Sequence, residues 1–135
     1  MPQITKQYKF CAAHKYWNDN WDENKNIENF DKDVKLHGHN YDLYVTIKGP
    51  INPDSGFIIN LKVLNKIVND RVIEILDHSL IQDNEWFKGK QPSTENLVVF
   101  IWNQICSEIS MPAQLHCIKL RETGTIFTEY YGDKY

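Results

Sequence analysis

The sequence has few cysteines, no long apolar run and no strong excess of either charge. Its three cysteines are an odd number and none lies in a Cys-x-x-Cys pair, which disfavours a disulfide framework and favours a reducing cytoplasm. No run approaches the roughly 18 apolar residues that a membrane-spanning helix needs. The opening stretch, MPQITKQYKF, lacks the apolar core of a signal peptide. We therefore expect a cytoplasmic protein with no membrane segment.

The charge balance disfavours nucleic acid as a partner. The formal net charge of −3 comes from 15 basic and 18 acidic residues, so a basic footprint over the whole surface is not expected. Hydrophobic residues make up 41% and charged residues 24% of the chain, as in an ordinary globular protein. The length predicts one domain over residues 1–135, with enough buried surface for one core.

The segment 18–33 has a skewed composition, because it is rich in Asn and acidic residues and contains no Gly or Pro. Asn and Asp side chains satisfy backbone groups locally, so we expect a long loop that joins two strands. Loops of this length often cover functional sites. A mobile, solvated excursion of the chain is an equally good interpretation of the composition.

Hydrophobic periodicity predicts the remaining elements. Four segments are expected to form strands, residues 6–13, 36–48, 115–121 and 125–131. Helices are expected over residues 61–76, with Asn60 as N-cap, and from Ser93 to about residue 109. The order ββααββ predicts an α+β fold in which two helices cover one face of a four-stranded antiparallel sheet.

Two of the five histidines lie two positions apart on the second predicted strand. The side chains of His37 and His39 therefore leave the same, otherwise apolar, face of that strand. Half-buried imidazoles need a partner, and a zinc ion held by three protein nitrogens would supply one. His14 follows the first predicted strand and is the natural third ligand if the two strands pair. The isolated His-Gly-His pattern alone favours the alternative of two hydrogen-bonded surface histidines.

Two acidic positions are further candidates. Asp77 next to His78, at the end of the first predicted helix, suggests a hydrogen-bonded pair that orients the imidazole. The spacing alone favours a histidine that interacts with the helix macrodipole. Glu122 shares the strand face of Ile118 and Leu120, where a carboxylate is costly unless it is paired, for example with the N–H edge of a guanidine-like heterocycle. A strand-end glutamate that turns to solvent is the alternative.

The three cysteines are interpreted as small buried hydrophobic residues. Cys11 has the opposite strand parity to His14, Cys106 falls in the second predicted helix and Cys117 in the third predicted strand. None has a basic neighbour in the sequence of the kind that activates a thiolate. The cysteines are therefore not among the predicted site residues.

Five short motifs, taken in their order along the chain, resemble the 6-pyruvoyltetrahydropterin synthase and 6-carboxytetrahydropterin synthase family. They are FCAAH at residues 10–14, LHGHNY at 36–41, LDH at 76–78, PSTENL at 92–97 and RET at 121–123. Each motif is short, but the ordered set spans most of the chain and is specific. The resemblance implies a T-fold of order ββααββ, which agrees with the periodicity.

The resemblance also implies roles for particular residues. It implies a catalytic zinc ion held by His14, His37 and His39, which reverses the preference for surface histidines. It implies that Asp77 and His78 form an acid/base pair. It further implies a set of residues that contact the pterin, with Glu122 as the anchor and Ser93, Thr94 and Glu95 near the ring.

The substrate that the resemblance implies is 7,8-dihydroneopterin triphosphate, and the implied assembly is a homohexamer, a dimer of trimers with sites between subunits. The commonest bacterial member makes 6-carboxytetrahydropterin for queuosine biosynthesis, so we predict that zinc-dependent lyase reaction first. Two alternatives are retro-aldol release of 6-hydroxymethyl-dihydropterin for folate and formation of 6-pyruvoyltetrahydropterin. An alternative of a different class is a catalytically silent protein that binds zinc and pterin.

The chain departs from the family at one important position. The family's cysteine normally lies four residues before the first histidine of His-Gly-His, and here that residue is Asp33. Some members carry Glu at that place, and they resemble the retro-aldol enzymes. A carboxylate is a usable proton acceptor. We therefore predict Asp33 as a catalytic general base. The alternatives are a carboxylate that lies too far back to take part and a plain loop residue.

Overall fold

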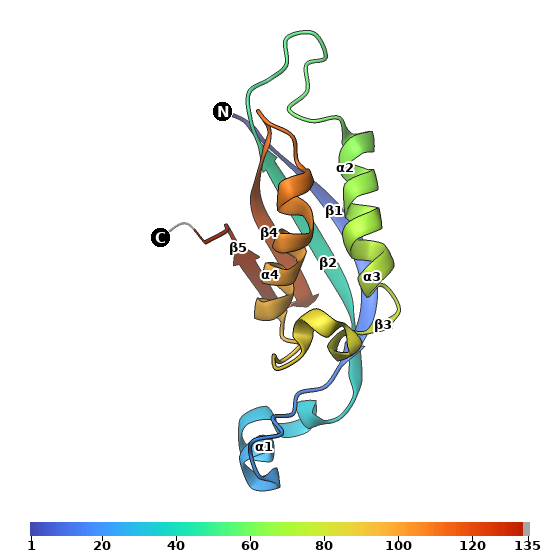
Figure 1. Ribbon diagram of the computed structural model, residues 1–135, viewed down its shortest axis with the longest axis vertical. Coiled ribbons are helices and arrows are strands. Elements are labelled where there is room, and N and C mark those ends of the chain that lie inside the picture. Colours follow the sequence, from blue (N-terminus) through green and yellow to red (C-terminus); the bar gives the residue numbers. More distant parts are fainter. Residues whose placement is uncertain (134–135) are drawn as a thin grey trace.

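The computed structural model describes residues 1–133 as a twisted sheet with helices packed on one face (Figure 1). Its five strands lie in the order β3–β1–β2–β4–β5. In chain order they are β1 (Gln3–His14), β2 (His37–Lys48), β3 (Ser79–Leu80), β4 (Gln114–Thr123) and β5 (Ile126–Tyr130). The pairs β1–β2, β2–β4 and β4–β5 are antiparallel, and the short β3 pairs with β1 in parallel. The predicted α+β class and the four long strands are confirmed.

β1 and β2 pair along their whole length, from Gln3 opposite Lys48 to His14 opposite His37. The alternation that was predicted for residues 36–48 fixes this register, because a slip of one residue would turn the apolar row towards solvent. The row is buried beneath the helices and consists of Tyr41, Leu43, Val45 and Ile47. The register therefore places His14 beside the two histidines of β2.

The helix that was predicted over residues 61–76 is one helical stretch with a wide turn in its middle. It comprises α2 (Leu61–Val68), a π-helical turn (Asn69–Ile73) and α3 (Glu74–Leu76). The side chain of Asn60 accepts a hydrogen bond from the Lys62 amide at 2.9 Å, as expected of an N-cap.

The second predicted helix begins near the expected start and is shorter than expected. α4 (Thr94–Ile105) is followed by a 3₁₀ turn (Cys106–Glu108). Ser93 is its N-cap, because its Oγ accepts a hydrogen bond from the Asn96 amide at 3.2 Å. This cap fixes the start of α4 beside the ends of β1 and β4.

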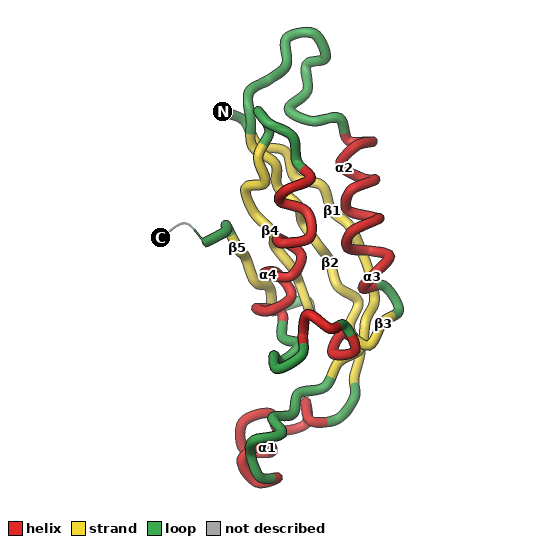
Figure 2. The backbone as a smooth tube through the Cα atoms, viewed as in Figure 1, coloured by secondary structure: helices red, strands yellow, loops and turns green. Residues whose placement is uncertain are grey.

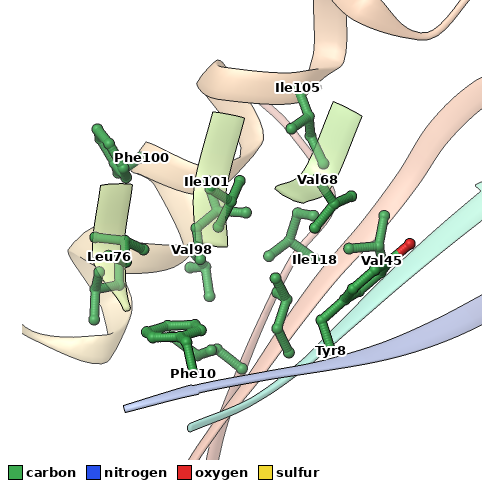
Figure 3. Close-up of a cluster of buried hydrophobic side chains, with 14 of the residues drawn as sticks. Tyr8, Phe10, Val45, Val68, Leu76, Val98, Phe100, Ile101, Ile105 and Ile118 are labelled. Atoms are coloured by element: carbon green, nitrogen blue, oxygen red, sulfur yellow. The ribbon is translucent and has the colours of Figure 1, made fainter. Parts of the chain in front are cut away.

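Apolar side chains of the sheet and of the helices meet in one core (Figure 3). In the close-up, strand residues point towards helix residues across the layer, and the labelled members are Tyr8, Phe10, Val45, Val68, Leu76, Val98, Phe100, Ile101, Ile105 and Ile118. Truncating one such side chain to Ala typically costs about 2–5 kcal/mol. The core therefore holds β1, β2 and β4, which carry the site residues, in a fixed arrangement.

The prediction of an irregular loop over residues 18–33 is wrong. The segment contains α1 (Glu23–Phe30) and a 3₁₀ turn (Asp31–Val34) beyond the ends of β1 and β2 (Figure 2). Asp22 caps α1, and the buried amide of Asn26 donates to the carbonyl oxygens of Asn18 and Asp22 at 3.0 Å each. Asn26 thus gives this polar segment an internal hydrogen-bonding centre that composition does not reveal.

The predicted count of four strands is also wrong by one. β3 pairs two of its residues with Ala12 and Ala13 of β1, and a two-residue strand is too short to show periodicity. Two 3₁₀ turns, Ile81–Asp83 and Glu85–Phe87, then lead to α4. Within residues 1–133, no helix has the length and apolar character needed to cross a membrane.

Candidate metal centre

Three histidines meet where β1 ends and β2 begins. His14 lies opposite His37, and Ala12 lies opposite His39, so all three side chains leave the face of the sheet that carries the core. The ring centroids are 4.5 Å apart for His14 and His37, 5.0 Å for His14 and His39, and 5.1 Å for His37 and His39. One ring nitrogen of each histidine lies within 4.8 Å of the others. The structure therefore brings together the three predicted metal ligands.

Main-chain carbonyls orient two of these rings. His14 Nδ1 lies 2.7 Å from the Pro92 carbonyl oxygen, and His37 Nδ1 lies 2.8 Å from that of Lys35. A carbonyl oxygen only accepts hydrogen bonds, so Nδ1 donates in both rings and Nε2 is the nitrogen available to a ligand. Such an anchor on the far nitrogen is typical of histidines that bind metals.

The cluster also contains polar atoms without hydrogen-bond partners. His14 is fully buried, and the Nε2 atoms of His14 and His39 make no hydrogen bond within residues 1–133. Buried polar groups are rarely left unsatisfied. Burial lowers the pKa of His39, most strongly among several causes, and this favours its neutral form. Neutral imidazoles with free lone pairs are suitable zinc ligands, so the residues present fit a metal ion.

The carboxylate of Glu122, on β4, lies beside the cluster. Its Oε1 is 3.0 Å from His39 Nε2 and 3.3 Å from His14 Nε2, and neither contact has hydrogen-bonding geometry. Thr94 Oγ1 donates a hydrogen bond to Oε2 at 3.0 Å. The contact with His14 lowers the pKa of the Glu122 carboxyl against the effect of partial burial, and His39 and Thr94 lower it further. Glu122 is therefore ionised at neutral pH and accepts from donors on the core side of the sheet.

Asp33 also lies near the cluster, at the exposed end of the 3₁₀ turn that precedes β2. Its Oδ1 is 3.7 Å from His37 Nε2, and its side chain is 57% exposed. The Asp33 carbonyl oxygen accepts a hydrogen bond from the Tyr16 amide at 2.9 Å, which ties this turn to the end of β1. The structure thus places Asp33 within reach of the same site.

The other two predicted residues at the start of α4 differ in their surroundings. Ser93 uses its hydroxyl as the helix cap, and Glu95 is exposed in the first turn. Tyr16 was not predicted, although its ring centroid lies 4.9 Å from that of His14. Burial, together with the charge of Glu122, raises the pKa of Tyr16. An aromatic residue two positions after a candidate ligand was the signal available in the sequence.

Asp77 and His78 are not part of this cluster within one chain. They lie between α3 and β3, where Asp77 Oδ2 is 3.1 Å from His78 Nδ1. Their contacts are with Cys11, whose side chain leaves the opposite face of β1 from His14 because strand positions alternate. In residues 1–133 no hydrogen bond or ion pair joins Asp77 or His78 to the three histidines.

Cys11 is the residue that the sequence interpretation missed. It is partly exposed and Cys106 is exposed, so only Cys117 matches the expectation of buried cysteines. His78, which contacts Cys11, is distant from it in the sequence, so no local sequence pattern predicts this contact. The two site clusters of the chain therefore share β1 but lie on opposite faces of it.

Known proteins match most of this chain. The family model described as 6-pyruvoyl tetrahydropterin synthase matches residues 3–133. The 6-pyruvoyl tetrahydrobiopterin synthase of Dictyostelium discoideum is 34% identical over 96% of this chain and 96% of its own length. The 6-carboxy-5,6,7,8-tetrahydropterin synthase of Bacillus subtilis is 30% identical over 74% of this chain and 70% of its own length.

The solved structure of Caenorhabditis elegans 6-pyruvoyl tetrahydropterin synthase superimposes with a TM-score of 0.88 at 29% identity, covering 98% of both chains. That similarity confirms the T-fold that the five motifs implied. The family match over residues 3–133 includes all the segments that supply the histidine cluster. The chain therefore belongs to the 6-pyruvoyl tetrahydropterin synthase family.

Proposed function

We propose that this protein is a zinc-dependent lyase that acts on 7,8-dihydroneopterin triphosphate. The observation that carries the proposal is the convergence of three histidines, two of them anchored by main-chain carbonyls, beside the carboxylate of Glu122. His14, His37 and His39 would hold the ion. Bound zinc supplies Lewis acidity that lowers the pKa of a ligated hydroxyl group.

The residues around the cluster suit a heterocycle with polar edges. The ionised Glu122 carboxylate would accept two N–H bonds from the amino-pyrimidine edge of a pterin, in the bidentate manner of charge-assisted pairs. Thr94 holds that carboxylate in place through its 3.0 Å hydrogen bond. Tyr16 and Tyr41 place aromatic rings 4.9 and 6.5 Å from His14, and these rings would exclude water from one side.

Asp33 is the group that we assign to proton transfer on the substrate side chain. It lies 3.7 Å from His37 on an exposed turn, so a bound substrate could approach it without moving the core. A carboxylate in this position accepts a proton but does not act as a thiolate would. Asp33 therefore replaces the family's cysteine with a weaker base.

The comparisons favour one product over the others. Relatives named 6-pyruvoyl tetrahydrobiopterin synthase match 96% of this chain, whereas the 6-carboxy relative matches 74%. We therefore propose 6-pyruvoyltetrahydropterin as the product, in place of the 6-carboxytetrahydropterin that the motifs suggested first. The 6-carboxy and 6-hydroxymethyl products remain the alternatives that the product mass would identify.

We also propose that the working protein is a homohexamer, a dimer of trimers, in which a neighbouring subunit completes the site. Asp77 and His78 lie on the other face of β1 from the histidine cluster, so one chain does not unite all the predicted catalytic groups. β5 leaves an edge with exposed Ile126 and Phe127, and bare sheet edges are rare in soluble proteins. Joining edges between subunits would cover them. A stable monomer in light scattering at micromolar concentration would contradict this assembly.

The test of function is turnover of 7,8-dihydroneopterin triphosphate by the purified, zinc-loaded protein, with the product identified by mass spectrometry. The proposal predicts release of triphosphate and the mass of 6-pyruvoyltetrahydropterin. Zinc and pterin binding without turnover would instead support the catalytically silent protein. A matched variant, His116→Ala, changes a partly exposed histidine of β4 outside the cluster and should leave turnover unchanged.

A further inference from the structure

A second cluster of reactive side chains lies on the outer face of the sheet, at the edge where β1 meets β3. Cys11 Sγ is 3.6 Å from His78 Nε2, and His78 Nδ1 is 3.1 Å from Asp77 Oδ2. The order of atoms is therefore thiol, imidazole, carboxylate. This is the arrangement in which a nucleophile contacts a base and a third group orients that base.

The backbone holds the three residues in this order. The amide of Cys11 donates to Asp77 Oδ1 at 2.9 Å, and its carbonyl oxygen accepts from the His78 amide at 2.6 Å. His78 has a φ of 59°, in the left-handed region that is unfavourable for a residue with a side chain. Such conformations persist where surrounding contacts enforce them, and they are common at functional sites.

The carboxylate also sets the tautomer of the imidazole. Asp77 Oδ2 lies 3.1 Å from His78 Nδ1 and only accepts protons, so this contact favours the neutral tautomer with the proton on Nδ1 and the lone pair of Nε2 towards the sulfur. The Cys11 amide, as the largest cause, lowers the pKa of the Asp77 carboxyl, and the His78 ring lowers it further. The ionised carboxylate stabilises the imidazolium that forms when His78 takes a proton.

We propose that Cys11 is a nucleophilic thiol and that the outer face of β1 is a site for covalent modification by soft carbon electrophiles. His78 is its proton acceptor, and Asp77 is the positioning residue. Small neighbours leave the sulfur accessible, because Ala13, Gly38 and Asn40 line the hollow beside it. The proposal uses Asp77 and His78, which the proposed function also assigns as an acid/base pair, but its test measures alkylation of Cys11 without substrate, so failure of one does not imply failure of the other.

The same three side chains could instead bind a metal, because one ligand atom of each lies within 4.8 Å of the others. The geometry favours the thiol base arrangement. Asp77 Oδ1 already accepts from the Cys11 amide, and Asp77 Oδ2 faces His78 Nδ1 at 3.1 Å. A metal ion would have to displace one of these contacts before the carboxylate became a ligand.

The reaction with iodoacetamide is a simple probe of this chemistry. The S–H proton of Cys11 passes to His78 Nε2, and the sulfur electron pair forms a bond to the methylene carbon. The carbon–iodine bond breaks and iodide leaves with its electron pair. Nothing is oxidised or reduced, so no further reactant is needed.

The chain provides its own comparison, because Cys106 is more exposed than Cys11 but has no imidazole neighbour among residues 1–133. An ordinary thiol is only about 3% thiolate at neutral pH, so activation has a ceiling of roughly 30-fold. Part of that gain is lost because a more acidic thiol is a weaker nucleophile. We expect iodoacetamide at neutral pH to alkylate Cys11 about five- to tenfold faster than Cys106, measured site by site by peptide mass spectrometry.

Two variants make the test specific. Asp77→Asn can still accept from the Cys11 amide, but its NH₂ group would face His78 Nδ1 and favour the tautomer that lacks a lone pair towards sulfur. Asp77→Asn and His78→Gln should both slow alkylation of Cys11 to the rate of Cys106, and His116→Ala should not. An equal or slower rate at Cys11 in the parent, or a rate unaffected by both variants in folded protein, overturns the proposal. A second zinc per chain that Cys11→Ser removes would also overturn it, in favour of a metal site.

Discussion

The inner and outer faces of β1 carry two clusters that use the same residue type in different ways. On the inner face, carbonyl oxygens anchor the rings of His14 and His37, and the free ring nitrogens converge. On the outer face, a carboxylate anchors the ring of His78, and its other nitrogen faces a thiol. A carbonyl oxygen at Nδ1 leaves Nε2 of the ring available to a metal ion, whereas a carboxylate at Nδ1 suits a ring that accepts a proton on its other nitrogen.

The chemical group that faces Nδ1 therefore distinguishes a candidate metal ligand from a candidate proton acceptor. The short sequence motifs that contain these histidines do not make that distinction. Both clusters belong to short motifs of the same family, and β1 contributes to both of them. In the inner cluster His14 is fully buried, and the side chains of His39 and His37 are 18% and 27% exposed, which suits metal binding. The outer cluster is open to solvent, with 79% of the His78 side chain exposed, which suits proton exchange.

The largest expected effect comes from breaking the inner cluster. A His37→Ala, His39→Ala double variant should lose its zinc and reduce turnover of 7,8-dihydroneopterin triphosphate to background, because one remaining ligand does not hold the ion. Metal analysis after chelation and reloading measures the zinc content. His116→Ala is the control and should retain one zinc per chain. Full zinc retention in the double variant would rule out this site.

The next effect concerns Asp33, which borders the inner cluster from the α1 side. Asp33→Ala should lower turnover by roughly 10²–10⁴-fold if its carboxylate is the general base. Asp33→Cys should change the rate or the product ratio, because a thiolate is a different base and nucleophile. Asp31→Ala, on the same 3₁₀ turn, is a control. If Asp33→Ala turns over the substrate like the parent with the same products, the base is another group.

A smaller loss is expected when the charge of Glu122 is removed. Glu122→Gln keeps the shape but loses one acceptor site and the charge-assisted pair with the pterin. Binding should weaken by about 1.5–3 kcal/mol, which is roughly 10- to 150-fold in affinity. Calorimetry with a non-reacting pterin measures it, and Glu28→Gln on exposed α1 is the control. Unchanged affinity would place the pterin anchor elsewhere.

Asn26 tests whether α1 supports the inner cluster. Asn26→Ala removes a buried amide that accepts from the Asn18 amide at 2.7 Å and donates to two carbonyl oxygens. Leaving those groups unsatisfied should cost about 1–3 kcal/mol, confined to α1 and the turn of Asp33. Hydrogen exchange should show lost protection over residues 18–34, with the sheet unaffected. Asn24→Ala, on the exposed surface of α1, should leave protection as it was.

The smallest effect is a pH dependence at the outer cluster. The pKa of Asp77 is lower in the folded chain than its ordinary value, first because of the Cys11 amide. Its contribution to stability is therefore complete above the ordinary value and is lost as pH falls through the lowered one. The difference in melting temperature between the parent and Asp77→Asn should be small at neutral pH and shrink further as pH falls from about 5. A difference that grows on acidification contradicts this sign.

Much of the fold was predictable because it rests on period-two and helical patterns. The alternation of β2 was enough to put His37 and His39 on the core side, and pairing with β1 added His14. β3 was missed because two residues carry no periodicity. α1 was missed because its stability depends on the buried amide of Asn26, and an Asn-rich segment taken locally favours turns.

The inner cluster was predictable from strand geometry, but the outer cluster was not. Sequence adjacency suggested that Asp77 orients His78. It did not show that a left-handed backbone at His78 turns the ring towards the sulfur of Cys11. That contact joins residues that are 67 positions apart, across the parallel pairing of β3 with β1. Only the tertiary structure reveals it.

X-ray absorption spectroscopy at the zinc edge of the chelated and reloaded protein compares the two clusters most directly. The inner cluster predicts one zinc per chain with three nitrogen neighbours at about 2.0–2.1 Å, an oxygen in the fourth position and no sulfur. The spectrum should be the same in Cys11→Ser and lost in the His37→Ala, His39→Ala variant. A neighbour at about 2.3 Å, the distance of a zinc–sulfur bond, would contradict the assignment of the metal to the three histidines.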